Sequence, residues 1–115
     1  MRVPQRSLLA LSLIVAASGG AWIEPAQAGD AAAGRIKARA ACETCHGEDG
    51  KGTLAGVPNL SGQRKEYLIE QLQAYRSGSR RNEQMSIIAK SLSDADIENV
   101  AEWYAGIKVT VEVPK

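Results

Sequence analysis

Apolar residues recur with helical spacing in two stretches in the second half of the chain. Residues 65–78 place three large apolar side chains at i, i+4 and i+7, which are Leu68, Leu72 and Tyr75. Residues 85–92 place four at i, i+3, i+4 and i+7, which are Met85, Ile88, Ala89 and Leu92. This spacing puts the apolar side chains on one face of a helix. It predicts two amphipathic helices, the first of which ends at Gly78.

A third helix has a clear start signal. Ser93 followed by Asp96 has the pattern of a capping box, in which each side chain bonds the backbone of the other residue. Leu92 and Ile97 flank this pattern and can form a hydrophobic staple. These residues predict a helix from the cap to Gly106.

The first half of the chain contains one more predicted helix and a loop. Asp30 can cap the stretch 31–41, which is rich in alanine and arginine and leads into Cys42. Residues 47–62 contain several glycines and one proline and have no helical period, which is typical of an irregular loop. No pair of strands is predicted before Gly106, so we expect an all-α fold.

The last residues differ from the rest, because apolar and polar positions alternate over residues 107–113, IKVTVEV. Alternation with a period of two is typical of a strand. We expect residues 107–115 to form an extended tail on the surface, since no second strand is predicted beside it. The alternative is a free edge to which another subunit adds a strand.

Residues 1–28 have the features of a secretory signal. Arg2 and Arg6 supply positive charge, residues 8–17 form an apolar run, and residues 26–28, Ala-Gln-Ala, match a signal peptidase site. The apolar run is too short to span a bilayer, so we expect the signal to be removed. The alternative is an uncleaved N-terminal anchor.

Removal of the signal leaves one domain at residues 29–106 and the tail, which together carry 12 basic and 12 acidic residues. A near-neutral chain lacks the broad basic face that nucleic acids require. No apolar run after Ala28 is long enough to span a membrane. The whole chain has no Phe, two Trp and three Tyr, so it has little apolar area to bury. A domain this small needs an additional stabilising element.

Both cysteines and the single histidine lie within five positions, as Cys42, Cys45 and His46. Three chemistries fit such a cluster. A thioredoxin-like pair requires its thiolate at a helix N-terminus after a strand, and no sheet is predicted here. A structural zinc site needs four ligands, so a carboxylate such as that of Glu48 or Asp49 would have to complete the set. The third chemistry is covalent attachment of haem.

The pentapeptide CETCH, residues 42–46, has the CxxCH pattern of c-type haem attachment. In that pattern the two thiols form thioethers with the two vinyl groups of haem, and the histidine binds the iron. Cysteines three positions apart lie on the same side of a helical turn, which suits two vinyl groups along one porphyrin edge. Export agrees with this chemistry. We therefore predict one covalent haem c at Cys42, Cys45 and His46.

With these residues the chain resembles the class I c-type cytochromes, and the resemblance covers nearly all of residues 29–106. An N-terminal helix leads into CETCH, and a loop contains GVPNL. A helix YLIEQLQAYRSGSR is then followed by a methionine and by LSDADIENVAEWYA. The sequence is most similar to short bacterial monohaem cytochromes and to single domains of dihaem relatives. The resemblance implies helices wrapped around one haem, with histidine and methionine as axial ligands.

The family pattern implies roles for two further residues. Met85, the only methionine besides the initiator, matches the second axial ligand. Alternatively it only fills the apolar stripe, and Lys51, Lys90 or no residue binds the iron. Pro58 in GVPNL matches the proline whose carbonyl accepts the ring N–H of the axial histidine, His46, although a proline there also shapes a turn.

Other matches to the family are less specific. Three residues match haem-packing positions and equally suit an ordinary core: Leu60, Leu72 and Ile88. Gly34 with Trp103 or Tyr104 matches the crossing of the first and last helices, where a small residue admits an aromatic ring. Arg80 or Arg81 matches a hydrogen-bond donor to a haem propionate, although basic residues there also suit a solvated surface.

A haem with both axial positions filled leaves no site for a substrate, so the resemblance implies an electron carrier and not an enzyme. We expect a periplasmic protein that exchanges single electrons with a redox-protein donor and acceptor. The first alternative is a haem subunit held permanently to an oxidoreductase such as a flavoprotein dehydrogenase, with the tail from Ile107 as the contact. The second alternative is a five-coordinate haem that binds small gases.

Overall fold

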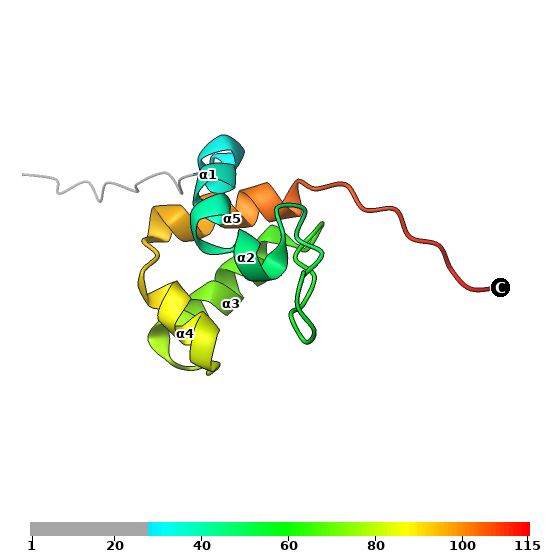
Figure 1. The fold of residues 1–115 in the computed structure, drawn as a ribbon. Coiled ribbons are helices and arrows are strands. Elements are labelled where there is room, and N and C mark those ends of the chain that lie inside the picture. The colour runs from blue at the N-terminus through cyan, green and yellow to red at the C-terminus, as the bar shows by residue number, and fades with distance from the viewer. Residues whose placement is uncertain (1–27) are drawn as a thin grey trace, which may run out of the picture.

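The computed structural model describes residues 28–115, and the predicted secretory signal lies outside this part except for Ala28. The described residues form five helices and no strand, which confirms the all-α prediction (Figure 1). In chain order the helices are α1 (Ala31–Ala41), α2 (Glu43–His46), α3 (Lys65–Ser77), α4 (Glu83–Lys90) and α5 (Asp94–Ala105). Within residues 28–115, none of the helices has the length and apolar character that a membrane span requires.

The helix starts predicted from capping residues are confirmed. The Asp30 carboxylate accepts hydrogen bonds from the backbone N–H groups of Ala32 and Ala33 at 2.8 and 3.2 Å, and α1 begins directly after Asp30. At α5 both bonds of the capping box between Ser93 and Asp96 are present, each 3.0 Å long. These side chains satisfy N–H groups that have no partner within the helix, so local sequence fixes both helix starts.

Helix α4 differs from the prediction at both ends. The apolar spacing predicts a start at Met85, whereas α4 begins at Glu83 because the Asn82 side chain accepts two N–H groups of the first turn. The helix ends at Lys90, and Leu92, which the prediction includes, lies buried in the connection to α5. The first turn of α4 is mostly polar, so its cap leaves no signal in the apolar pattern.

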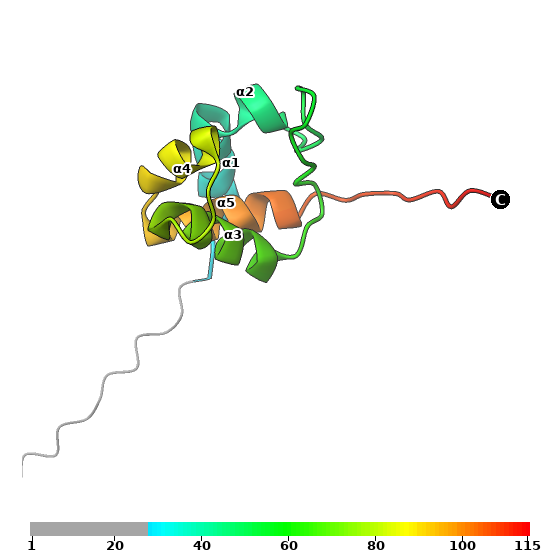
Figure 2. The ribbon, with the colours of Figure 1, turned by 90° about the horizontal axis from the view of Figure 1, so that it is seen from below.

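Helix α1 crosses α5 at close range, while α3 lies against α5 and α4 against α3 (Figures 1 and 2). Gly34 makes the crossing possible, because a methyl group in its place would overlap the carbonyl oxygen of Asn99 and meet Cβ of Trp103 at 3.0 Å. The buried cluster around the crossing is Ala38, Leu68, Val100, Ala101 and Tyr104. The first and last helices therefore cross at a glycine, as the family pattern implies, with Trp103 rather than Tyr104 against it.

The tail is extended and largely exposed. Residues 108–115 form no regular structure, and Figures 1 and 2 show them running away from the helices. The start of the tail does touch the helical body, because Ile107 packs against the core and Val109 lies beside Gly62. The expected extended tail is thus present, but most of it lies away from the surface of the helices.

Candidate functional site

The two cysteines and the histidine lie at the short helix α2, which follows α1 without a loop (Figure 1). Cys42 ends α1 and begins α2, and its carbonyl oxygen accepts the N–H groups of Cys45 and His46 at 3.2 and 2.9 Å. Both cysteines are half-buried free thiols. The structure therefore places two thiols one helical turn apart, followed directly by an imidazole.

The Cys42 thiol is protonated at neutral pH. Burial raises its pKa to about 11, and the positive charge of Lys37 only partly offsets this effect. A thioredoxin-like pair needs a thiolate of lowered pKa, so the environment of Cys42 argues against that alternative. Within residues 28–115, no group of three or more His, Cys, Asp or Glu side chains is placed to hold a metal ion, so a zinc site made from side chains alone finds no support there.

His46 is buried, with 6% of its surface exposed, and its ring is bonded to the loop that follows α2. Its Nδ1 lies 3.0 Å from the carbonyl oxygen of Pro58. A carbonyl oxygen can only accept a hydrogen bond, so Nδ1 carries the proton and donates it. This contact leaves Nε2 as the ring nitrogen that is able to bind a metal.

The loop after α2 closes back on this helix and satisfies the carbonyl groups at its end. The N–H groups of Gly52 and Thr53 bond the carbonyl oxygens of His46 and Cys45 at 2.7 and 2.9 Å. The Thr53 hydroxyl lies 3.0 and 3.1 Å from the carbonyl oxygens of Thr44 and Cys45. These carbonyls have no partner within the helix, so the loop holds the end of α2 in place. Thr53 was not predicted, since one threonine in a glycine-rich loop gives no periodic signal.

Tyr104, on α5, holds the residue that follows His46. Its side chain is fully buried beside Gly50, and its hydroxyl donates to the carbonyl oxygen of Gly47 at 3.2 Å. Burial raises the pKa of the Tyr104 hydroxyl well above its usual value, so the hydroxyl remains a donor at neutral pH. The sequence places Tyr104 only at the helix crossing, whereas the structure also connects it to the cysteine and histidine segment.

Glu48, two residues after His46, is bound by two arginines of α1. Its Oε1 atom lies 2.6 Å from Nη2 of Arg35 and 2.9 Å from Nη2 of Arg39. The hydrogen bond from Arg35, followed by that from Arg39, lowers the pKa of the Glu48 carboxyl, so it is ionised at neutral pH. Glu48 thus ties the loop to α1 and is not available to complete a zinc site.

Met85 lies apart from this hydrogen-bonded group. It is in the first turn of α4, its side chain is half-buried, and α4 packs against α3. Of the alternative ligands, Lys51 lies 3.7 Å from the carboxylate of Asp49, and Lys90 is exposed at the end of α4. The structure therefore brings four of the five predicted haem-binding residues together and leaves Met85 on a separate helix.

The less specific family matches lie around the core. Three predicted packing residues are half-buried: Leu60, Leu72 and Ile88. Leu60 and Leu72 contact the buried cluster directly. Arg80 and Arg81 are both exposed, and the guanidinium of Arg80 lies over the ring of Tyr75, 4.6 Å from its centroid. Of the two arginines predicted near a propionate, Arg81 is therefore the one not stacked on a ring.

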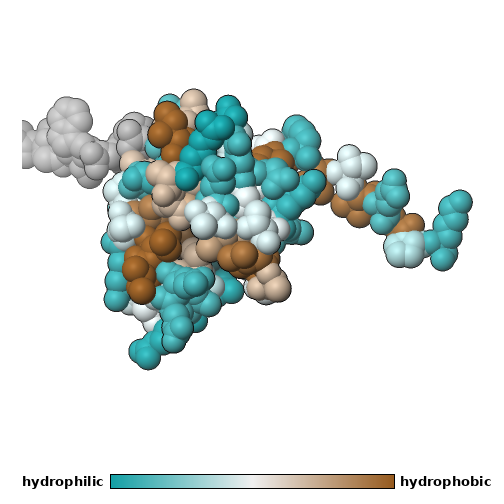
Figure 3. All heavy atoms as spheres, in the orientation of Figure 1, coloured by the Kyte–Doolittle hydropathy of each residue, from teal (hydrophilic) through white to brown (hydrophobic). Residues whose placement is uncertain are grey.

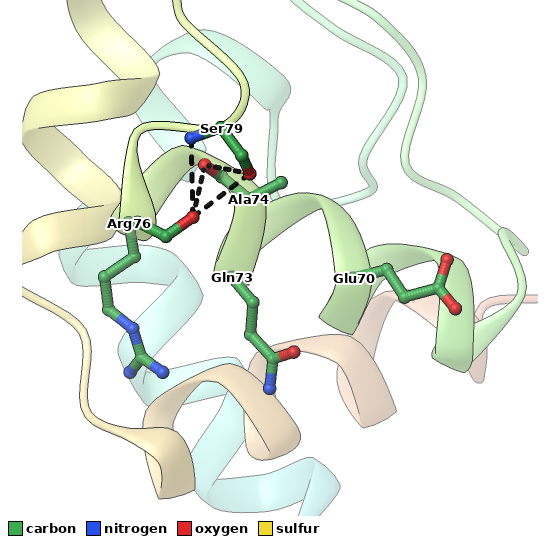
Figure 4. Close-up of a pocket in the computed structure, with 6 residues that line it drawn as sticks. Glu70, Gln73, Ala74, Arg76 and Ser79 are labelled. Carbon is green, nitrogen blue, oxygen red and sulfur yellow. Dashed lines mark hydrogen bonds between the residues drawn. The ribbon is translucent and has the colours of Figure 1, made fainter.

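A polar hollow of about 510 Å³ lies along α3 and the turn after it (Figure 4). Its lining consists of Glu70, Gln73, Ala74, Arg76, Ser77 and Ser79. Figure 4 shows Ser79 hydrogen-bonded to Ala74 near the end of α3, and the Ser77 hydroxyl donates to the same carbonyl oxygen. None of the predicted site residues lines this hollow, so it is separate from the cysteines and the histidine.

The donor set fits a covalently bound haem. Two free thiols, one turn apart, can each add to a vinyl group, and the imidazole next to them presents Nε2. Residues 28–115 offer too few grouped side-chain ligands for a structural metal ion, whereas a porphyrin brings four nitrogen ligands of its own. The arrangement can therefore hold an iron porphyrin from one side through Cys42, Cys45 and His46.

Several known proteins are similar to this chain in sequence. The family model described as cytochrome C oxidase, cbb3-type, subunit III, matches residues 29–103. Cytochrome c-554(548) of Halomonas halodenitrificans is 44% identical over 81 residues, which are 68% of this chain and 96% of that protein. The thiosulfate dehydrogenase electron acceptor of Stutzerimonas stutzeri is 42% identical over 69 residues, which are 57% of this chain and 32% of that protein.

The fold is also similar to that of a known structure. The crystal structure of reduced recombinant cytochrome c4 from Pseudomonas stutzeri matches with a TM-score of 0.66 and 36% identity. The match covers 73% of this chain and 48% of that chain. The chain spans about half the length, or less, of the cytochromes c4 that it matches.

Proposed function

The chain belongs to the class I c-type cytochromes, a family that carries covalently bound haem c, and from this premise we propose that it carries single electrons between redox proteins. When bound, the haem supplies the chemistry, which is the one-electron change between Fe(II) and Fe(III). The polypeptide would bind the haem through Cys42, Cys45 and His46 and would orient the histidine through the Pro58 carbonyl. We assign no catalytic residue, because electron transfer needs no bond to a substrate.

Cys42 and Cys45 would attach the haem through two thioethers. Both are half-buried free thiols at α2, and the chain contains no other cysteine. The single CxxCH sequence supports one haem per chain. The same helical turn holds both thiols, so a thioether bond formed by one cysteine would bring the haem within reach of the other cysteine.

The observation that carries the proposal is the hydrogen bond from His46 Nδ1 to the Pro58 carbonyl, 3.0 Å long. This bond fixes the tautomer and the orientation of the ring, and it makes Nε2 a better donor to iron. A histidine that only fills the core would also be hydrogen-bonded. Two thiols in the preceding turn are what favour haem over that explanation.

Met85 would supply a second side-chain ligand to the haem iron. It is the only methionine among the described residues, and its side chain is half-buried on α4. A thioether is a soft ligand that favours Fe(II), so it raises the reduction potential relative to a second histidine. If His46 and Met85 both bound the iron, no ligand position would remain for a substrate, which supports a carrier rather than an enzyme.

We place the mature protein in the periplasm. The support is the charged, apolar and small-residue pattern of residues 1–28, together with a haem attachment sequence that belongs to exported proteins. N-terminal sequencing of the protein recovered from a periplasmic extract tests this assignment. We expect a chain that starts at Gly29. Recovery of the full-length chain in the membrane fraction would contradict it.

Absorption spectra of the purified protein, oxidised and reduced, test the haem itself. The alkaline pyridine assay identifies haem c, and mass spectrometry should show one added haem per chain. A colourless chain without added mass, isolated from cells that mature such proteins, would contradict the proposal as a whole.

Met85→Ala tests the second ligand separately. We expect the variant to lose the far-red band of the bond between sulfur and Fe(III), and its reduced form to bind carbon monoxide. Ile87→Ala is the matched control, because Ile87 is exposed on the same helix, and it should change neither property. Retention of the far-red band in Met85→Ala would exclude Met85 as the ligand while leaving the attachment at Cys42 and Cys45 intact.

A second candidate function is a haem subunit bound permanently to an oxidoreductase. Two comparisons favour it: the relative named a thiosulfate dehydrogenase electron acceptor, and a matching structure of thiosulfate dehydrogenase TsdBA from Marichromatium purpuratum. Gel filtration of a native cell extract distinguishes the two functions. A free carrier elutes as a small haem protein, whereas a subunit elutes with the activity of its enzyme.

A further inference from the structure

The tail carries a row of exposed apolar side chains. Val109, Val111 and Val113 are 56%, 77% and 82% exposed, and they alternate with Lys108, Thr110 and Glu112. Figure 3 shows this alternation of apolar and polar residues along the extended segment. An extended strand with unpaired backbone groups and one apolar face is a template for pairing with another strand. Residues 28–115 form no strand with which the tail could pair inside the same chain.

The sequence of the tail is complementary to itself when two copies run antiparallel. With Thr110 of one copy opposite Thr110 of the other, Lys108 stands opposite Glu112, Val109 opposite Val111, and Ile107 opposite Val113. Residues that stand opposite each other in an antiparallel pair lie on the same face. One face of the ribbon then holds two Lys–Glu pairs, and the other holds only Val and Ile.

We propose that two copies of this chain associate through antiparallel pairing of residues 107–113, about a two-fold axis at Thr110. In such a two-fold interface, every contact between a residue of the first copy and a residue of the second copy occurs twice, with the two copies exchanged. Both tails are then fully used, so the assembly stops at a dimer. The charges select this arrangement, because a parallel pair in register would place Lys108 opposite Lys108 and Glu112 opposite Glu112. A shift that moves the centre to Val111 would place Lys108 opposite Pro114 and lose both ion pairs.

Two features of the structure support self-pairing. Lys108 and Glu112 are exposed, and neither forms an ion pair with another described residue, so both charges are available to a second copy. Ile107 packs against the core, and Val109 lies beside Gly62. In the paired state Val113 of the second copy comes opposite Ile107, so the apolar face of the ribbon continues the core of each copy.

Charge exchange tests the pairing in the haem-loaded protein. Sedimentation equilibrium should give twice the mass of one chain at high concentration. Lys108→Glu and Glu112→Lys each turn two attractive pairs into two repulsive ones, so each should weaken association about tenfold or more. The double variant with both changes restores opposite charges in every pair and should recover the dimer. Unchanged haem absorption in all three variants shows that the helical domain is intact.

Cross-linking tests the axis independently. Thr110→Cys places two thiols opposite each other, and mild oxidation should link the copies. Val113→Cys is the matched control, because its two copies stand six positions apart along the ribbon and are too distant to bond. The unsubstituted protein is oxidised in parallel to account for Cys42 and Cys45.

Three results would overturn the proposal. The first is the mass of a single chain at every concentration up to the millimolar range. This result would overturn the proposal even if the tail were then found to bind a different protein. The second is a dimer that both charge reversals leave unchanged, because its interface must then lie elsewhere. The third is equal cross-linking of Thr110→Cys and Val113→Cys. These results are independent of whether the proposed electron carrier function is right.

Discussion

Replacing Tyr104 by phenylalanine removes one buried hydroxyl and keeps the ring that packs beside Gly50. The change takes away the 3.2 Å hydrogen bond to the Gly47 carbonyl. That carbonyl keeps a second partner, since it also accepts the N–H of Gly50 at 3.1 Å. The loss is therefore that of one neutral hydrogen bond, about 1 kcal/mol, and not the larger penalty of an unsatisfied buried carbonyl.

Thermal unfolding of the haem-loaded protein measures this loss. A change of about 1 kcal/mol should lower the midpoint temperature by about 4–8 °C for a domain of this size. Tyr67→Phe is the matched control, because it makes the same chemical change on an exposed ring of α3. Its effect should stay within about 0.5 kcal/mol of zero.

The Tyr104→Phe variant also has a predictable dependence on pH. Burial raises the pKa of Tyr104 in the folded state above the usual value for tyrosine, about 10. Below that pH the residue is neutral in both the folded and the unfolded states. Above it the unfolded state releases a proton that the folded state retains, so the unsubstituted protein loses stability as the pH rises.

The size of this effect sets the pH at which the unsubstituted protein and the Tyr104→Phe variant have the same free energy of unfolding. At pH 11 an unfolded tyrosine that ionises alone costs the unsubstituted protein about 1.4 kcal/mol. Phenylalanine has no such loss, so the deficit of about 1 kcal/mol should shrink above pH 10, vanish between about pH 10 and pH 11, and be slightly reversed at pH 11. Equal stabilities at pH 7 would refute the hydrogen-bond argument. A deficit that stays constant up to pH 11 would refute the argument from burial.

Two further variants test the helix crossing and the loop. Gly34→Ala adds a methyl group where the carbonyl of Asn99 already lies, so urea unfolding should show a loss of about 1–3 kcal/mol. An unchanged midpoint would mean that α1 and α5 can separate without cost. Thr53→Val keeps the shape of the side chain but removes the hydroxyl that bonds the end of α2, which should cost about 1 kcal/mol in the same assay. Thr53→Ser should recover most of that loss, and failure to do so would assign the effect to packing.

The helix ends were predictable where their signals are local. Asp30, Ser93 and Gly78 each lie within one residue of the helix that they begin or end. The spacing of Cys42 and His46 is a local pattern of the same kind. The start of α4 was missed because its cap precedes a polar first turn, where the apolar period carries no information.

The contacts around the site could not be predicted in this way. The hydroxyl of Tyr104 meets the carbonyl of Gly47 across 57 positions, and Arg35 meets Glu48 across 13. Tyr104 and Gly47 come together where α5 packs against α1, which leads directly into α2, whereas Arg35 and Glu48 meet because the chain after α2 lies beside α1. No local pattern encodes either arrangement. Pro58 was found by resemblance to a family, since a proline in a loop has several possible roles.

The small core has a consequence for turnover in the cell. Among residues 28–115, the largest fully buried side chains are Tyr104 and Ile97, so this part of the polypeptide alone buries little apolar volume. A chain still waiting for its prosthetic group would open often, and proteases would reach it. The steady amount of protein would then follow the capacity of the haem ligation machinery and the supply of iron, rather than the rate of translation.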